Sequence, residues 1–159
     1  MKQVDGVSVV VPAYRSTTTL AELVARIDRA LGARAHEVVI VDDGSPPATW
    51  EAIAAIARSN PRVTGLRLGR NAGQHNALLA GVRRASMPLV VTMDDDLQNP
   101  PEEIPALLAP LDRGDADVVY GRPKVIGQPF WRRRASVWSR SIIAWATGPE
   151  AARTAVEFS

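Results

Sequence analysis

The segment Leu89-Val90-Val91-Thr92-Met93 runs directly into Asp94-Asp95-Asp96, and this junction is the clearest indication of the fold. An almost continuous apolar run of this length is typical of a strand that is buried on both faces of a sheet. Four more such runs occur, at residues 7–11, 38–41, 63–68 and 116–120. Polar or special residues follow each run, so we expect them to collect along one edge of a sheet.

Helical patterns separate the five runs. The first has apolar residues spaced along one helix face and ends at Gly32, with the set Leu20, Leu23, Val24, Ile27 and Leu31. Three more helices are expected around residues 50–57, 77–85 and 104–111. We expect Ser45 to cap the first of these three and Asn71 to cap the next. Alternating strands and helices predict an α/β fold with a mostly parallel sheet, whose ligands bind at the carboxyl ends of the strands.

Composition excludes several classes of protein. The 159 residues fit one domain, and the absence of cysteine excludes disulfides and thiolate metal sites. No apolar run is long enough to span a membrane, and we expect no signal peptide. The net charge of +2 gives no reason to expect a nucleic-acid partner. Residues 94–117 carry a net charge of −7 and residues 118–149 carry +6, which fits a site for a metal ion and an anion.

The acidic loop after residue 93 offers a partial shell of oxygen ligands. If the chain stays extended, Asp94, Asp96 and Gln98 point to one side and Asp95 to the other. Carboxylate and amide oxygens suit Mg²⁺ or Mn²⁺, with water and phosphate oxygens completing the shell. The alternative is a solvated acidic turn at the start of the next helix.

Two other segments allow more than one interpretation. Residues 42–45, Asp-Asp-Gly-Ser, can form a turn and cap, or one carboxylate can bind a base N–H or a ribose hydroxyl. Trp131, Trp138 and Trp145 would share one face of a helix. That helix would pack on the core, lie at a membrane surface or place arginines on a phosphate. The motifs of NAD enzymes, P-loop NTPases and serine hydrolases are absent from the sequence.

Four segments together resemble family 2 glycosyltransferases of GT-A fold. They read Val-Val-Val-Pro-Ala-Tyr, Val-Asp-Asp-Gly-Ser, Arg-Asn-Ala-Gly-Gln-His-Asn-Ala and Met-Asp-Asp-Asp-Leu-Gln-Asn-Pro-Pro-Glu-Glu-Ile-Pro. The last is similar to the polyprenyl-phosphate branch, with its dolichyl-phosphate mannosyltransferases and undecaprenyl-phosphate aminoarabinose transferases. The resemblance implies a Rossmann-like α/β/α sandwich, with residues 1–159 forming a nucleotide-sugar-binding domain that is truncated at its C-terminus.

The resemblance also implies roles for individual residues. The residues that bind the donor would be Pro12, Ala13 and Tyr14 around the base, Asp42 in contact with the base, and also Asp94 and Asp95. The metal, Mg²⁺ or Mn²⁺, would be held by Asp94, Asp96 and Gln98. Phosphate would be bound by Arg122, Arg133 and Arg134, and the catalytic residues would be Asp96 and Arg122. Two positions depart from the family pattern: Arg15-Ser16 replace the usual Asn-Glu, where the Glu binds ribose, and Asp95 replaces a small residue.

The implied function is inverting, metal-dependent transfer of a sugar from a nucleotide-diphosphate sugar to a polyprenyl phosphate of undecaprenyl type, for cell-envelope glycans. The enzyme would work at the cytoplasmic face of the cell membrane, held by residues 131–147 or by helices beyond residue 159. The alternatives are a family 2 transferase with a soluble glycan or protein acceptor, and a donor-binding fragment without turnover. A nucleotidyltransferase is a further rival, because it also uses metal-binding carboxylates.

Overall fold

A six-stranded sheet forms the centre of the computed structural model, which describes residues 6–121 and 143–146. The strands lie in the order β3-β2-β1-β4-β6-β5. The first four along the chain pair in parallel, and β6 runs antiparallel to β4 and β5. This confirms the expected α/β fold with a mostly parallel sheet. The bounds are β1 Val7–Ala13, β2 His36–Asp42, β3 Val63–Arg67, β4 Leu89–Thr92, β5 Val118–Tyr120 and β6 Ile143–Ala146.

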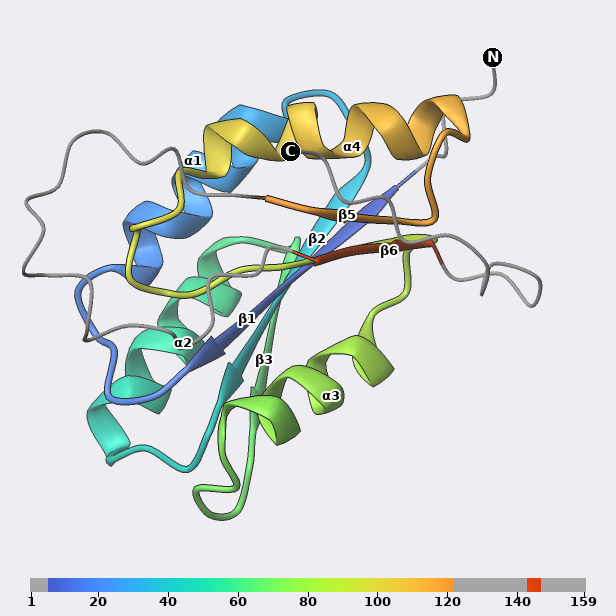
Figure 1. Ribbon diagram of the computed structural model, residues 1–159. Coiled ribbons are helices and arrows are strands. Elements are labelled where there is room, and N and C mark those ends of the chain that lie inside the picture. Colours follow the sequence, from blue (N-terminus) through green and yellow to red (C-terminus); the bar gives the residue numbers. More distant parts are fainter. Residues whose placement is uncertain (1–5, 122–142, 147–159) are drawn as a thin grey trace, which may run out of the picture.

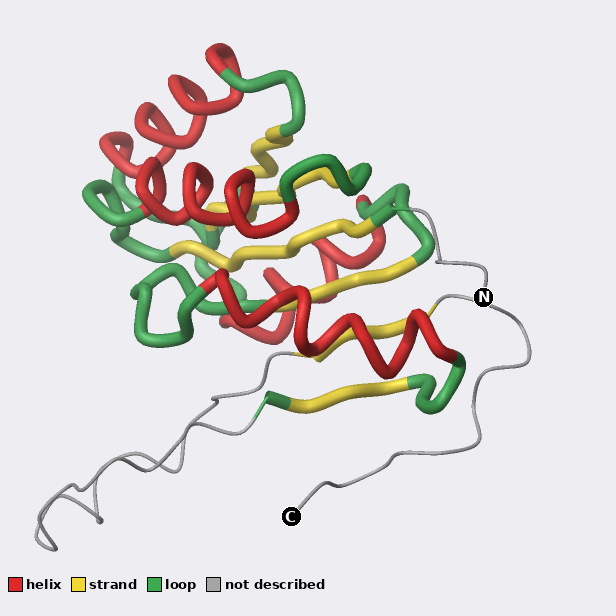
Figure 2. The backbone as a smooth tube through the Cα atoms, turned by 90° about the horizontal axis from the view of Figure 1, so that it is seen from above, coloured by secondary structure: helices red, strands yellow, loops and turns green. Residues whose placement is uncertain are grey.

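Helices cover both faces of the sheet, which makes a three-layer sandwich (Figures 1 and 2). The helices are α1 Leu20–Leu31, α2 Pro47–Ser59, α3 Gln74–Arg84 and α4 Ile104–Arg113, with a short 3₁₀ helix, η1 Pro101–Glu103, before α4. Alternate residues of β1 face opposite layers. Val9 and Val11 join the core with α1, α2 and α4, whereas Val10 packs with Ala77 of α3 on the other face. The five expected strands and four expected helices are all present.

Both expected helix caps are wrong. Pro46 occupies the cap position of α2, and Gly73 occupies that of α3, each without a side-chain cap hydrogen bond. The hydroxyl of Ser45 instead accepts a hydrogen bond from the backbone N–H of Arg15, 3.0 Å away. Ser45 therefore connects the loop after β2 to the loop after β1.

The tryptophan stripe is also wrong at its C-terminal end. Trp145 lies in β6 and pairs with Val90 of β4 and Val118 of β5, so a helix cannot continue through it. Trp131 and Trp138 lie outside the described residues. In the part of the chain that the structure describes, no helix combines the length and apolar character needed to cross a membrane.

The strand register brings the functional loops together. Ala13, the last residue of β1, is opposite Asp42 at the end of β2, and Asp42 is opposite Arg67 at the end of β3. Val10 of β1 is opposite Thr92 at the end of β4. The four loops that follow these strands consequently start from one edge of the sheet.

Gly81 sets how closely α3 approaches the sheet. A Cβ there would overlap with Cγ1 of Val10 and lie 3.1 Å from Cγ2 of Val41. We predict that Gly81→Ala lowers the free energy of unfolding by about 1–3 kcal/mol, because the core must shift to admit the methyl group. Urea unfolding measures the change. Gly69→Ala is the matched control, since nothing lies within 4 Å of a Cβ there. Equal stability of the two variants would contradict the prediction.

Candidate active site

Asp42 is wholly buried at the end of β2. Its Oδ1 accepts a hydrogen bond from the backbone N–H of Ser45 at 2.9 Å. Its Oδ2 lies 3.3 Å from Nε of Arg67 but accepts no hydrogen bond among the described residues. The structure thus places Asp42 at the expected edge of the sheet, but covered from solvent.

Asp43 joins the loop after β2 to the loop after β3. Its two carboxylate oxygens accept hydrogen bonds from the backbone N–H groups of Ala72, at 2.7 Å, and Gly73, at 3.0 Å. Gly44 has a φ of 65°, and a Cβ there would overlap with the backbone of Arg70 and Asn71. The sequence predicted either a turn and cap here or a carboxylate that binds a base N–H or a ribose hydroxyl. Both oxygens of Asp43 are engaged by the backbone after β3. The local sequence gave no indication of its partners, which lie about thirty residues away.

The loop after β1 carries the other residues expected near a base. Pro12 and Ala13 are buried within β1, whereas Tyr14 is 46% exposed. Arg15 has a φ of 58°, and its guanidinium carbon lies 5.1 Å from the centre of the Tyr14 ring. A left-handed conformation is costly for a residue other than glycine, and such strain is often found at functional sites. Tyr14 is thus the exposed aromatic side chain of this loop, with the guanidinium of Arg15 beside its ring.

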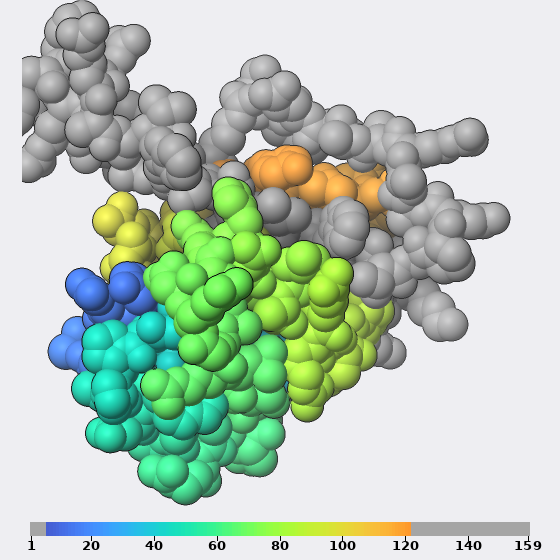
Figure 3. Space-filling view, turned by 90° about the horizontal axis from the view of Figure 1, so that it is seen from below, coloured from blue at the N-terminus to red at the C-terminus, as the bar shows by residue number. Residues whose placement is uncertain are grey.

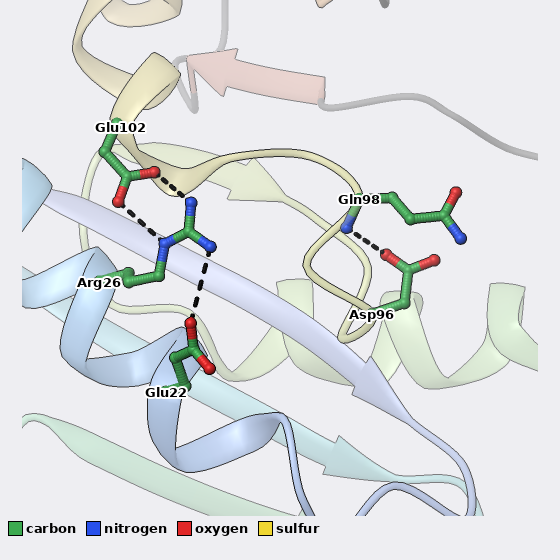
Figure 4. A network of polar contacts seen from close by, with 5 residues as sticks. All are labelled: Glu22, Arg26, Asp96, Gln98 and Glu102. Atoms are coloured by element: carbon green, nitrogen blue, oxygen red, sulfur yellow. Dashed lines mark hydrogen bonds and ion pairs between the residues drawn. The ribbon is translucent and has the colours of Figure 1, made fainter.

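The acidic loop after β4 does not stay extended, so the expected alternation of side chains is wrong beyond Asp94. The backbone bends over residues 95–99, and Leu97 is left-handed with a φ of 60°. Asp96 stabilises the bend, because its Oδ1 accepts a hydrogen bond from the backbone N–H of Gln98 at 2.9 Å (Figure 4). The turn is a local side-chain-to-backbone motif that a pattern of alternation ignores.

Negative charge is concentrated in this loop. Burial, and then the charge of Asp96, raises the pKa of Asp94, and a hydrogen bond from Gln74 acts in the opposite direction. Nε2 of Gln74 is 2.7 Å from Oδ1 of Asp94. Burial also raises the pKa of Asp95, which a hydrogen bond from Ser16 partly offsets. Asp95 therefore contacts the loop after β1, and Figure 3 shows the yellow β4 loop close to the blue loop after β1.

The acidic loop fits a divalent cation as a partial shell. Within the described ranges, no three side chains of Asp, Glu, His or Cys gather closely enough to hold a metal ion alone. Repulsion between Asp94 and Asp96 is the kind of unfavourable charge that a bound cation removes. Mg²⁺ and Mn²⁺ commonly use one or two carboxylates and take further oxygens from phosphate and water. Asp94 and Asp96 fit that requirement.

Arg26 of α1 anchors the C-terminal end of the acidic loop (Figure 4). Its Nε and Nη2 donate to the two carboxylate oxygens of Glu102, at 2.9 and 2.6 Å, and Glu22 lies 3.9 Å away. The hydrogen bond from Arg26 is the largest cause that lowers the pKa of Glu102 to about 2. The sequence analysis missed this pair, because its partners are separated by 76 positions.

A pocket of about 400 Å³ lies at the same sheet edge, between the loops after β2 and β3. It is lined by Gly44, Ser45, Arg67, Leu68 and Gly69. Sequence reasoning assigned no role to Arg67, whose position opposite Asp42 depends on strand register. Arg122, Arg133 and Arg134, the expected phosphate ligands, lie outside the described residues.

Residues 8–156 match the profile described as Glycosyl transferase family 2. The chain belongs to this family. It is 42% identical over 151 residues to the undecaprenyl-phosphate 4-deoxy-4-formamido-L-arabinose transferase of Edwardsiella ictaluri. The aligned residues make up 92% of this chain and 46% of that protein. The chain spans less than half the length of the curated relatives it matches.

Solved structures of other glycosyltransferases share its fold. The mannosyltransferase PcManGT from Pyrobaculum calidifontis, solved with GDP-Man and Mn²⁺, is 29% identical with a TM-score of 0.52, over 57% of this chain and 27% of that chain. S. aureus TarS, residues 1–349, is 27% identical with a TM-score of 0.58, over 80% and 39% of the two chains. These matches confirm the expected GT-A fold of this family 2 chain.

The Arg26–Glu102 pair predicts a pH-dependent contribution to stability. The carboxyl pKa falls from 4.5 to about 2 on folding, so the ionised form is favoured in the folded protein. The contribution is therefore present above about pH 4.5 and is lost as the pH falls toward about 2. We expect Glu102→Gln to lower the melting temperature at neutral pH, with a difference from the unmodified protein that shrinks on acidification. Glu103→Gln is the control for removal of one charge, and an identical pH profile for both variants would contradict the assignment.

Proposed function

We propose that this family 2 chain is the donor-binding part of an inverting glycosyltransferase that moves a sugar from a nucleotide-diphosphate sugar to a polyprenyl phosphate of undecaprenyl type. The observation that carries the proposal is the meeting of two features at one sheet edge. The acidic loop after β4 is suited to a metal-bound diphosphate. The loops after β2 and β3 line a pocket, and the loop after β1 carries the exposed Tyr14. The relatives named for transfer to undecaprenyl phosphate support the choice of acceptor.

The donor would lie across this edge, with its base toward the loops after β1 and β2. Pro12, Ala13 and Tyr14 would line the pocket for the base, and Asp42 would contact the base. Asp94 and Asp95 lie at the diphosphate end. The likeness to the structure of PcManGT with GDP-Man and Mn²⁺ supports a nucleotide-sugar donor and a divalent metal.

Asp94, Asp96 and Gln98 are the proposed holders of Mg²⁺ or Mn²⁺ on the donor diphosphate. A bound divalent ion would stabilise the negative charge that develops on the departing nucleoside diphosphate. Asp96 and Arg122 are the proposed catalytic residues, with Arg122 assisting the leaving group. The bend at Leu97 matters for this role, because it fixes the Asp96 carboxylate against the Gln98 backbone.

A phosphate acceptor removes the need for a general base. A phosphomonoester has a second pKa of about 6, so it is mostly ionised and nucleophilic at neutral pH. One acceptor oxygen then forms the bond to the anomeric carbon as the diphosphate departs from the opposite side, with inversion. Arg133 and Arg134 are proposed to bind phosphate, and attachment to the cytoplasmic face of the cell membrane follows from a lipid-linked acceptor. A soluble glycan or protein acceptor is the second candidate, which transfer assays with soluble acceptors would distinguish from polyprenyl phosphate.

Asp96→Ala tests the metal assignment. We expect this variant to lose the extra thermal stabilisation that Mn²⁺ gives in the presence of UDP, GDP or dTDP, because one of two metal-binding carboxylates is gone. Thermal-shift assays with and without Mn²⁺ measure the effect, and sugar transfer to polyprenyl phosphate in membrane fractions measures turnover. Asp115→Ala, in the connection between α4 and β5, is the matched control. Mn²⁺-dependent stabilisation or transfer that survives in Asp96→Ala would exclude the assignment.

A further inference from the structure

Arg67 covers the one carboxylate that the proposed function places at the nucleobase. Asp42 has no exposed surface, whereas the side chain of Arg67 is 42% exposed. Nε of Arg67 is 3.3 Å from Oδ2 of Asp42, the oxygen that accepts no hydrogen bond within the described residues. A ligand in the adjacent pocket would meet the guanidinium before it could meet the carboxylate.

Three contacts fix the guanidinium in this position. Besides the ion pair with Asp42, Nη2 of Arg67 donates to the backbone carbonyl of Ser45 at 3.4 Å. The guanidinium carbon also lies 5.9 Å from the centre of the Trp50 ring, within the range of a cation–π contact. No hydrogen bond or ion pair of Nη1 occurs in the described part of the chain, so this nitrogen is available to donate to a ligand. Arg67 also lines the pocket of about 400 Å³.

We propose that Arg67 is the residue that contacts the nucleobase of the donor, and that Asp42 acts through it as a positioning residue. The inference rests on the proposed function, and it changes which side chain reads the base. Asp42 neutralises the guanidinium from behind and fixes its orientation, as a buried carboxylate commonly does for an arginine. The pocket then presents a planar, rigid hydrogen-bond donor to the edge of the base.

This arrangement selects one chemical class of base. A guanidinium carries donors and no acceptor, so it requires an oxygen or an unprotonated nitrogen opposite it. If position 4 of a pyrimidine or position 6 of a purine faces Arg67, uracil, thymine and guanine present a carbonyl oxygen there, whereas cytosine and adenine present an amino group. An amino group facing Arg67 would bring two donors into contact and would forgo the hydrogen bond that a carbonyl oxygen accepts, which is unfavourable. We therefore expect the pocket to prefer bases that turn a carbonyl oxygen, rather than an amino group, toward Arg67.

The ligands to compare are UDP with CDP and GDP with ADP. Each pair exchanges a carbonyl for an amino group and removes the proton of the neighbouring ring nitrogen, and GDP also carries a 2-amino group that ADP lacks. Isothermal titration calorimetry with Mn²⁺ gives the four dissociation constants for the unmodified protein, Arg67→Ala, Arg67→Lys and the control Arg62→Ala. Arg62 is exposed and directly precedes β3, so its removal subtracts the same charge at the opposite end of the strand. We expect the unmodified protein and the control to prefer UDP over CDP, or GDP over ADP.

Arg67→Ala should weaken binding of the preferred carbonyl base by about tenfold to a hundredfold, the usual effect of losing a hydrogen bond to a charged group. The ratio of the two dissociation constants in each pair should move toward one. Arg67→Lys keeps a positive charge beside Asp42 and so protects the fold, but it lacks the planar fork. It should also lose base preference. Full base preference in both variants would overturn the inference.

A double-mutant cycle separates direct from indirect action of Asp42. If Asp42 acts through Arg67, Asp42→Asn weakens UDP binding in the unmodified protein but has little further effect in Arg67→Ala or Arg67→Lys. Equal losses in both backgrounds would show that Asp42 touches the base itself, and would overturn the inference. Circular dichroism melting curves confirm that each variant is folded. Absence of any nucleotide binding by the unmodified protein would overturn the proposed function together with this inference, whereas binding with unchanged base preference would overturn the inference alone.

Discussion

Parallel hydrogen bonding of β1 to β2 on one side and to β4 on the other is the interaction from which the rest of the structure follows. It aligns Ala13 with Asp42 and Val10 with Thr92, so the loops after three strands begin side by side. The residues proposed to bind the donor lie at the ends of these strands or in the loops that follow them. The register of the strands decides which side chains meet, because a shift of one residue would turn each of them to the opposite face.

Side-chain contacts then connect the loops to one another. Asp43 holds the backbone after β3, Ser45 holds the backbone after β1, and Arg26 holds the chain that follows the acidic loop. Each contact joins a side chain to a segment far away in sequence. The open edge of the sheet is consequently a connected surface, which is what a ligand with a base, a sugar and a diphosphate requires.

The elements of the fold were predictable because they follow from local patterns. The buried Val-rich runs and the spacing from Leu20 to Leu31 directly indicated strands and a helix. The polar residues after the strands indicated where the candidate site would lie. The caps were not predictable. Ser45 has the right chemistry for a cap, but the loop after β1 supplies a different partner, and no local pattern contains that information. Trp145 was assigned to a helix for the same reason, since its strand partners are Val90 and Val118.

The candidate site, like the fold, was predictable only in part. Asp42, Asp94 and Asp96 were identified by type and position, and the structure places all three at the expected edge. The burial of Asp42 could not be predicted, because Arg67 lies beside it only through the register between β2 and β3. The bend at Leu97 likewise depends on one backbone hydrogen bond that an extended-chain pattern does not include.

The position of β6 has a consequence for the order in which the chain folds. Among the described strands, β5 pairs with β6 alone, and β6 comes from residues 143–146. The four parallel strands can assemble once residue 92 is available, whereas β5 must wait for a segment more than twenty residues further along the chain. During synthesis on the ribosome, the ends of β1, β2 and β3 that carry the proposed donor site would therefore come together before β6 covers β4. Until β6 pairs with β4, the backbone groups on that side of β4 are unpaired. This side of β4 is therefore where a nascent chain is most exposed to incorrect strand pairing.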